Sequence, residues 1–237
     1  MIDTFLFDLD GTLLPMDTQT FIDTYFHELG KAFSDITHPK LLLKNVIAAT
    51  DEMISNQDYI TNEEVFMKEF NRLIDGDMSV YMNRFDNFYN TQFDNVKRST
   101  SSLPLISECI KLLKEKNYTA AIATNPIFPQ VAIHKRIEWS GLNISDFSHI
   151  TSYEGCHYCK PYVQFYQEIL DVMGKKPEQC IMVGNDVQED LVAGKLGMQT
   201  FLITNNMINR ENEKIESTYT GTYEDFYRFV QGIKPIE

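Results

Sequence analysis

The sequence is short of long apolar runs and of cysteine, and each shortage excludes a class of protein. No stretch of the 237 residues approaches the roughly 18 apolar residues of a transmembrane helix. The first apolar run has no basic segment before it and contains acidic residues, so it does not indicate a secretory signal. Four cysteines without such a signal favour the reducing cytoplasm over a disulfide-stabilised secreted fold.

Basic residues are also scarce, because 21 Lys and Arg stand against 34 Asp and Glu, a formal net charge of −13. Broad surfaces for nucleic acid or anionic membranes need positive charge, so neither partner is expected. Any phosphate ligand must be held by local cations or by a metal ion, since the field of the whole chain repels it. The oligomeric state, monomer or homodimer, is left open.

Two of the cysteines, Cys156 and Cys159, form a C-x-x-C pattern that invites a zinc or redox interpretation. A structural zinc site needs about four ligands, and no second ligand pair at matching spacing is present. The pattern therefore favours two ordinary cysteines over a metal or redox site.

The chain is organised around its first apolar run, residues 4–7, which leads directly into Asp8, Asp10 and Gly11. A short apolar run bounded by turn signals predicts a buried strand. Its end should lie at the carboxyl edge of a sheet, where ligands bind in open α/β folds. Two crowded carboxylates need a cation or a shared proton, and Mg²⁺ suits oxygen ligands. The alternative is an ordinary strand end with an Asp-Gly turn.

From residue 16 to residue 98 the sequence is rich in aromatic and aliphatic residues at helical spacing. Four short helices are predicted, beginning near Thr18, Pro39, Thr61 and after Gly76. Their aromatic stripes indicate the core of a small helical bundle.

After a polar linker at residues 99–104 the pattern changes to alternating helices and strands. Strands are predicted at residues 118–123, 149–152, 180–183 and 200–203, with helices at 105–116, 131–139, 162–173 and 189–196. This alternation predicts a parallel sheet with helices on both faces, which the first strand joins. We therefore expect a Rossmann-like core of residues 1–15 and 99–237, with residues 16–98 inserted as a helical domain.

Polar groups of distinct kinds follow the later strands. The hydroxyl of Thr124 and the main chain at Asn125 suit a phosphate oxygen, although both residues are also ordinary helix caps. Lys160, beside a carboxylate cluster, would supply a cation for a phosphoryl group, although a lone Lys is usually a surface charge. Asp186 and Asp190 lie one helical turn apart and could ligate or orient a metal, or simply favour a helix start.

The four segments Asp8 to Leu13, Thr124-Asn125, Lys160-Pro161 and Gly184 to Asp190 resemble the ordered motifs of the haloacid dehalogenase-like (HAD) phosphatase superfamily. The resemblance covers essentially the whole chain. The helical insert is similar to the C1-type cap of that family, which closes over a Rossmann-like core.

The resemblance implies a Mg²⁺-dependent phosphatase that acts on a small phosphorylated metabolite. Asp8 would be the nucleophile and Asp10 the general acid and base. Thr124, Asn125 and Lys160 would hold the phosphoryl oxygens. Mg²⁺ would be held by the Asp8 carboxylate, the main-chain carbonyl of Asp10 and an acid of the fourth motif.

One departure concerns that acid. Many family members have Gly-Asp where this chain has Gly184-Asn185, so either Asn185 or the neighbouring Asp186 takes the metal-ligand place. We favour Asp186, because its spacing puts it on the same helical face as Asp190. Asn185 and Asp190 would then support the site.

Two rival functions stay open. The second acid, Asp10, disfavours a dehalogenase, but a phosphosugar mutase of the β-phosphoglucomutase type shares both acids and the cap class. A catalytically weak binding protein of the same fold is motivated by Asn185. Phosphoglycolate, a sugar phosphate and a nucleotide monophosphate are all compatible substrates.

Overall fold

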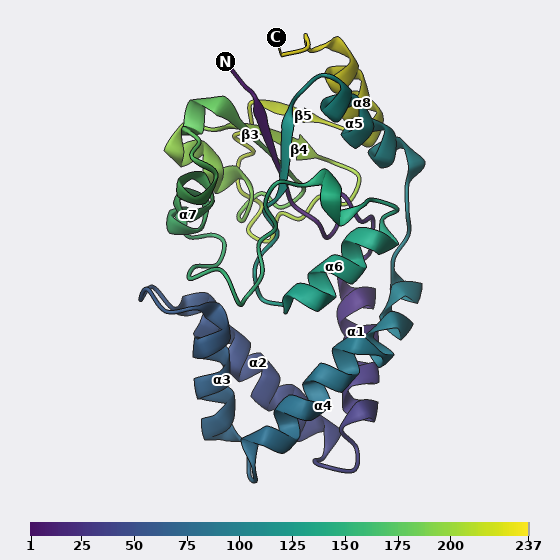
Figure 1. Ribbon diagram of the computed structural model, residues 1–237, viewed down its shortest axis with the longest axis vertical. Helices are drawn as coiled ribbons and strands as arrows, with labels where there is room; N and C mark the ends of the chain where they lie inside the picture. The colour runs from purple at the N-terminus through teal and green to yellow at the C-terminus, as the bar shows by residue number, and fades with distance from the viewer. Residues whose placement is uncertain (237) are drawn as a thin grey trace.

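A five-stranded parallel sheet forms the centre of the computed structural model, which describes residues 1–236 (Figure 1). The strands are β1 (Thr4–Phe7), β2 (Thr119–Ile122), β3 (Cys180–Gly184), β4 (Gln199–Ile203) and β5 (Tyr219–Gly221), in the spatial order β2-β1-β3-β4-β5. β1 pairs in parallel with β2 on one side and β3 on the other. The predicted parallel α/β sheet is confirmed, and the residues after these three strands meet at one edge.

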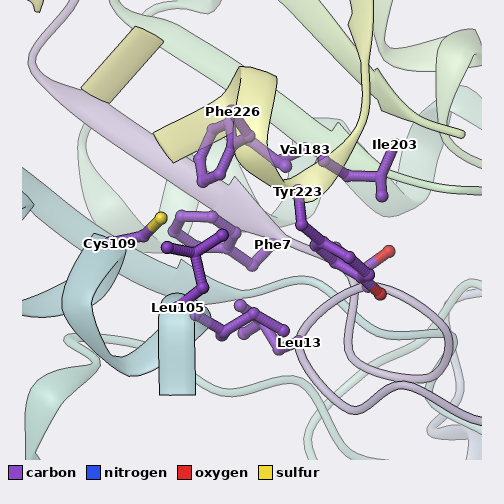
Figure 2. Close-up of a pocket in the computed structure, with 10 residues that line it drawn as sticks. Phe7, Leu13, Leu105, Cys109, Val183, Ile203, Tyr223 and Phe226 are labelled. Carbon is purple, nitrogen blue, oxygen red and sulfur yellow. The ribbon is translucent and has the colours of Figure 1, made fainter. Parts of the chain in front are cut away.

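Helices cover both faces of the sheet, as predicted (Figure 1). These helices are α5 (Pro104–Glu115), α7 (Val163–Met173) and α8 (Tyr223–Gly232). Because side chains alternate along a strand, Leu6 enters the core under α7 while Phe5 and Phe7 enter the core under α5 and α8. Figure 2 shows this second core, in which Phe7 meets Cys109 and Phe226 around a small apolar cavity.

A helical bundle lies beyond the carboxyl edge of the sheet (Figure 1). It consists of α1 (Thr18–Ala32), α2 (Pro39–Ser55), α3 (Asn62–Leu73), α4 (Met78–Asn90) and the 3₁₀ segment η1 (Gln92–Ser99). The four predicted helices are confirmed, and Thr61 caps α3 in a reciprocal capping box with Glu64. Buried Phe70 and Phe88 confirm that the aromatic stripes form the core of this bundle.

The two segments that connect the sheet to the bundle lie side by side. The main-chain N–H of Ser101 donates to the carbonyl of Pro15 at 2.9 Å, and Met16 forms an isolated β-bridge with Thr100. The predicted linker is shorter than expected, since η1 runs to Ser99. The division into two domains at these residues stays a prediction.

Two predicted elements differ in the structure. Residues 149–152 form only an isolated bridge between Ile150 and Ile122, because the chain turns away after Thr151, whose hydroxyl donates to the carbonyl of Thr124. The helix predicted at 189–196 is the 3₁₀ segment η4 (Leu191–Leu196), which begins only after Asp190. The remaining elements are α6 (Gln130–Trp139), η2 (Ile144–Asp146) and η3 (Pro177–Gln179).

Within residues 1–236, no helix is both long enough and apolar enough to cross a membrane.

Candidate active site

The loop after β1 begins at Asp8, whose main-chain N–H still donates to Val183 of β3 at 2.9 Å. The chain then turns sharply at Gly11, which has a φ of +85° in the left-handed region. A Cβ atom at Gly11 would also collide with the side-chain amide of Asn185. Glycine is therefore required there for both the backbone conformation and the close approach of the fourth motif.

Lys160 joins the first and fourth motifs. Its Nζ donates to Asp8 Oδ1 at 2.9 Å and to Asp190 Oδ1 at 2.6 Å. All three residues are buried, with exposed fractions of 8% for Asp8 and 1% each for Lys160 and Asp190. Lys160 therefore lies beside a carboxylate cluster, as predicted, and its side chain is buried and is not a surface charge.

Two buried carboxylates share this one ammonium group, which leaves a net negative charge. Burial raises the pKa of Asp8 to about 6 and that of Asp190 to about 7, although Lys160 opposes both shifts. Burial also acts against the charged form of Lys160, but Asp190 and Asp8 outweigh it and raise the pKa of the amine. Lys160 is therefore a cation at neutral pH.

Asn125, which follows β2, holds the third and fourth motifs together. Its Oδ1 accepts from the main-chain N–H of Lys160 at 3.1 Å, and its Nδ2 donates to Glu189 Oε2 at 3.3 Å. The neighbouring Thr124 is buried beside it. The structure therefore brings the residues predicted to hold phosphate to one edge of the sheet.

The fourth motif folds back on itself around Gly184. Asp190 packs so closely on Gly184 that a Cβ atom there would overlap its carboxylate, and Asp190 Oδ2 accepts from the N–H of Asp186 at 2.9 Å. Asp186 Oδ1 in turn accepts from the main-chain N–H groups of Gln188 and Glu189, each at 3.0 Å. These bonds fix the turn that directs Asp190 toward Lys160.

Asn185 points to the other side of the same turn. Its Oδ1 accepts from the hydroxyl of Thr12 at 3.0 Å, and its Nδ2 donates to the carbonyl of Asn206 at 2.6 Å. Both halves of the amide are therefore engaged in holding the loop after β1. Which of Asn185 and Asp186 is the metal ligand stays a prediction.

Asp10 pairs with Arg136 of α6 through its Oδ2, while its buried Oδ1 has no hydrogen-bond partner among residues 1–236. Arg136 is fully buried, and its guanidinium carbon lies 4.4 Å from the centre of the Phe128 ring. The ion pair fixes the orientation of Asp10, and it leaves Asp10 Oδ1 and Arg136 Nη2 without a hydrogen-bond partner among residues 1–236.

Three charged residues at this site were missed by the sequence reasoning. Arg136 was predicted only as part of a helix; it follows His134 and Lys135, but its spacing of three residues from the buried Ile133 places it on the same helical face. Glu189 lies in the fourth motif, Gly184 to Asp190, but the sequence assigned it no role. Burial raises the pKa of its carboxyl group to about 7. Arg210, which pairs with Asp186 at 2.6 Å, follows no pattern that could have identified it.

Asp8, Asp186 and the main-chain carbonyl of Asp10 offer oxygen ligands, which hard divalent cations prefer. In the described part of the chain, however, no group of three or more His, Cys, Asp or Glu side chains is close enough to hold a metal. The Asp8 and Asp186 carboxylates are engaged by Lys160 and Arg210. A metal at this edge must therefore draw on main-chain or water oxygens and compete with these ion pairs.

The C-x-x-C cysteines are both buried and free, although Cys159 directly precedes Lys160. Burial raises the pKa of the Cys156 thiol to about 12, and a thiol of that pKa is a poor nucleophile at neutral pH.

Comparison with known proteins gives a consistent assignment. Residues 2–197 match the family model described as haloacid dehalogenase-like hydrolase. Among curated proteins, pyrophosphatase PpaX of Oceanobacillus iheyensis is 25% identical over 82% of this chain and 79% of its own length. Glyceraldehyde 3-phosphate phosphatase of Methanothermobacter thermautotrophicus is 24% identical over 91% of this chain and 92% of its own.

Among solved structures, a HAD phosphatase from Thermococcus onnurineus is similar with a TM-score of 0.63. It is 17% identical and is matched over 99% of this chain and 100% of its own. At this identity the similarity shows the shared fold.

Proposed function

The chain belongs to the haloacid dehalogenase-like hydrolase family, whose model matches most of its length, and from that premise we propose that it hydrolyses phosphate monoesters of a small metabolite through a phosphoaspartate on Asp8. The enzyme class follows from the family and from relatives that are named as phosphatases and a pyrophosphatase. The observation that supports the mechanism most is the buried contact of Lys160 with Asp8 and Asp190, with Asp10 two residues after Asp8.

In the proposed first step an oxygen of the ionised Asp8 carboxylate attacks phosphorus. The bond between phosphorus and the ester oxygen breaks, and Asp10 donates a proton to the leaving oxygen. A pKa of about 6 keeps Asp8 mostly ionised at neutral pH. Lys160, Thr124 and Asn125 hold the phosphoryl oxygens and stabilise the charge that the transition state spreads over them.

In the second step Asp10 takes a proton from water, and the water oxygen attacks the phosphorus of the phosphoaspartate. The bond between phosphorus and Asp8 breaks, which releases inorganic phosphate and restores the carboxylate. Arg136 is a positioning residue: its contact with Asp10 Oδ2 orients the carboxyl group, so that Oδ1 carries the proton that is donated in the first step and taken from water in the second.

Phosphatases of this family generally use a divalent metal. We propose Mg²⁺, with Asp8, the main-chain carbonyl of Asp10 and Asp186 as the residues that would hold it and Asn185 and Asp190 as their support. When bound, the ion would neutralise charge on the phosphoryl oxygens.

The proposed function is tested by measuring inorganic phosphate released from p-nitrophenyl phosphate with Mg²⁺, and again after EDTA. Release that EDTA abolishes and added Mg²⁺ restores supports the proposal. No release from this ester or from a panel of phosphorylated metabolites would instead favour the binding protein. Transfer of the phosphoryl group to a second substrate hydroxyl would favour the mutase.

Asp10→Asn is expected to lower kcat for alkyl phosphates by about 100-fold or more, because a general acid and base contributes about that factor. The loss should be smaller for p-nitrophenyl phosphate, whose leaving group needs little protonation. Steady-state kinetics on both esters measures the difference. Near-normal turnover of the alkyl ester would contradict the role assigned to Asp10.

Asp186→Asn is expected to raise the Mg²⁺ concentration for half-maximal activity by about tenfold or more, since one ligand charge is lost. The matched variant Asn185→Asp is expected to change it far less, because the Asn185 side chain is directed at Thr12 and the Asn206 carbonyl, although the new carboxylate loses the amide donor to that carbonyl. Magnesium titrations of phosphate release compare the two. The reverse order would assign the ligand position to Asn185.

A further inference from the structure

A cavity of about 630 Å³ lies between the helical bundle and the core, and Asp10 is one of its lining residues. Its volume is typical of a site for a small organic ligand. Because Asp10 is the proposed proton donor to the leaving oxygen, the part of the substrate beyond that oxygen enters this cavity.

The lining is largely apolar and strongly aromatic. Its rings come from both the bundle and the core, and they belong to Phe21, Tyr25, Phe66, Phe85, Tyr89, Phe128 and Tyr153, with Phe26 beside them. Several of these rings pack edge to face. In one such pair, Tyr25 and Phe128, the edge of one ring meets the face of the other.

Every charged residue in the lining is acidic. These residues are Asp10, Asp51, Glu63, Asp86 and Glu154, and no Lys, Arg or His lines the cavity within the described chain. Of these acids, only Asp10 is ion-paired among residues 1–236, with Arg136; Asp51, Glu63, Asp86 and Glu154 form no ion pair there, although Glu154 accepts from the main-chain N–H of Gln130. Burial, followed by the charges of Glu154 and Glu64, raises the pKa of Glu63, so the acids repel one another.

The cations nearest to the catalytic residues are already engaged. Arg136 is buried behind the lining and paired with Asp10, and Lys160 is shared between Asp8 and Asp190. A second anionic group on the substrate would find no cation among the described residues that line the cavity. It would meet unpaired carboxylates instead, and the repulsion between like charges disfavours its binding.

We propose that the substrate is a phosphate monoester whose leaving group carries a positive charge on a compact apolar frame, as in the phosphate ester of an amino alcohol. Aromatic faces and unpaired carboxylates together form the usual binding site for an ammonium group. This inference rests on the proposed phosphatase function and narrows it. It also separates this chain from the relative named as a pyrophosphatase, because the leaving group of pyrophosphate is an anionic phosphate.

The test compares phosphocholine with its neutral isostere 3,3-dimethylbutyl phosphate, which differs mainly in charge, and with the smaller, anionic phosphoglycolate. The kcat/KM for phosphocholine is expected to exceed that for the neutral isostere by about tenfold, and phosphoglycolate is expected to be the poorest. The advantage of phosphocholine should shrink as ionic strength rises, since the attraction is electrostatic. A ratio of one or less, or a preference for phosphoglycolate, would overturn the inference.

The double variant Glu63→Gln with Asp86→Asn removes two of the unpaired charges and is expected to bring the ratio of the two kcat/KM values to about twofold or below. The control is Glu108→Gln with Glu115→Gln, which removes the same charge from exposed positions of α5 outside the cavity lining. The control should retain the tenfold ratio. If both variants lower it equally, the preference reflects net charge and the cavity assignment fails.

Binding of the alcohols separates this inference from the phosphatase function. Choline and 3,3-dimethylbutanol undergo no hydrolysis, so their dissociation constants in isothermal titration calorimetry report the cavity alone. Tighter binding of choline, lost in Glu63→Gln with Asp86→Asn, supports the charge preference even if no ester is hydrolysed. Hydrolysis of p-nitrophenyl phosphate with no preference for choline would overturn the substrate class while leaving the phosphatase function in place.

Discussion

Asp8→Asn is expected to abolish phosphate release, with a loss of at least about 10⁴-fold in kcat for every ester the enzyme accepts. The amide has the size of the carboxylate but has no anionic oxygen to attack phosphorus, so no covalent intermediate forms. The substitution also relieves the excess negative charge around Lys160, because one carboxylate then faces the ammonium group instead of two. The variant is therefore expected to be at least as stable as the native protein.

Two measurements separate loss of chemistry from loss of structure. Thermal unfolding should show a melting temperature equal to or above that of the native protein, whereas phosphate release should disappear. The matched control is Asp3→Asn at the opposite end of β1, where Asp3 pairs with Lys175 on the surface at 2.8 Å. This control should keep nearly full activity. Appreciable turnover by Asp8→Asn would remove the nucleophile from the proposed mechanism.

Lys160→Met is expected to lower the free energy of unfolding by roughly 3–5 kcal/mol at pH 8, the usual cost of removing one partner from a buried ion pair. Asp8 and Asp190 then face each other without a cation in a buried site. Activity should fall as well, since the phosphoryl oxygens lose their ammonium partner. Urea unfolding at several pH values measures the stability change.

The pH dependence of this variant follows from the two acids. Burial already raises the pKa of Asp8 to about 6 and of Asp190 to about 7, above the 3.8 of an unperturbed Asp. Removal of Lys160 should raise both further, so the folded state binds more protons than the unfolded state. The stability contribution of the neutral acids is present below pH about 4 and is lost as pH rises through the folded pKa values. The defect of Lys160→Met should therefore be small at pH 5 and largest at pH 8.

The control is Lys175→Met, which removes a partly exposed lysine from its pair with Asp3. Its cost should be at most about 1 kcal/mol, as expected for a surface ion pair, and should hardly change between pH 5 and pH 8. A pH-independent defect in Lys160→Met would indicate lost packing of the lysine side chain and not unpaired carboxylates.

The sequence predicted the sheet because its signals are local. A run of four apolar residues before Asp8 indicates a buried strand whatever it pairs with, and the later alternation of strands and helices leaves a parallel sheet as the only compact solution. Residues 149–152 were the exception. That segment pairs with the sheet only through the bridge between Ile150 and Ile122 of β2. Local composition does not show how many residues of a segment will pair with a neighbouring strand.

The sequence by itself determined that Asp8, Asn125 and Asp190 come shortly after buried strands, and hence that they would meet at one edge. Parallel strands make this outcome a matter of topology, since their carboxyl ends coincide. Only the tertiary structure decided that Lys160, which follows no strand, reaches Asp8 and Asp190. It also decided that Asp10 is paired with Arg136, and that no residue among 1–236 supplies a cation to the lining of the adjoining cavity. Helical periodicity shows which side of a helix is buried, but the partner of a buried charge depends on how separate elements pack in space.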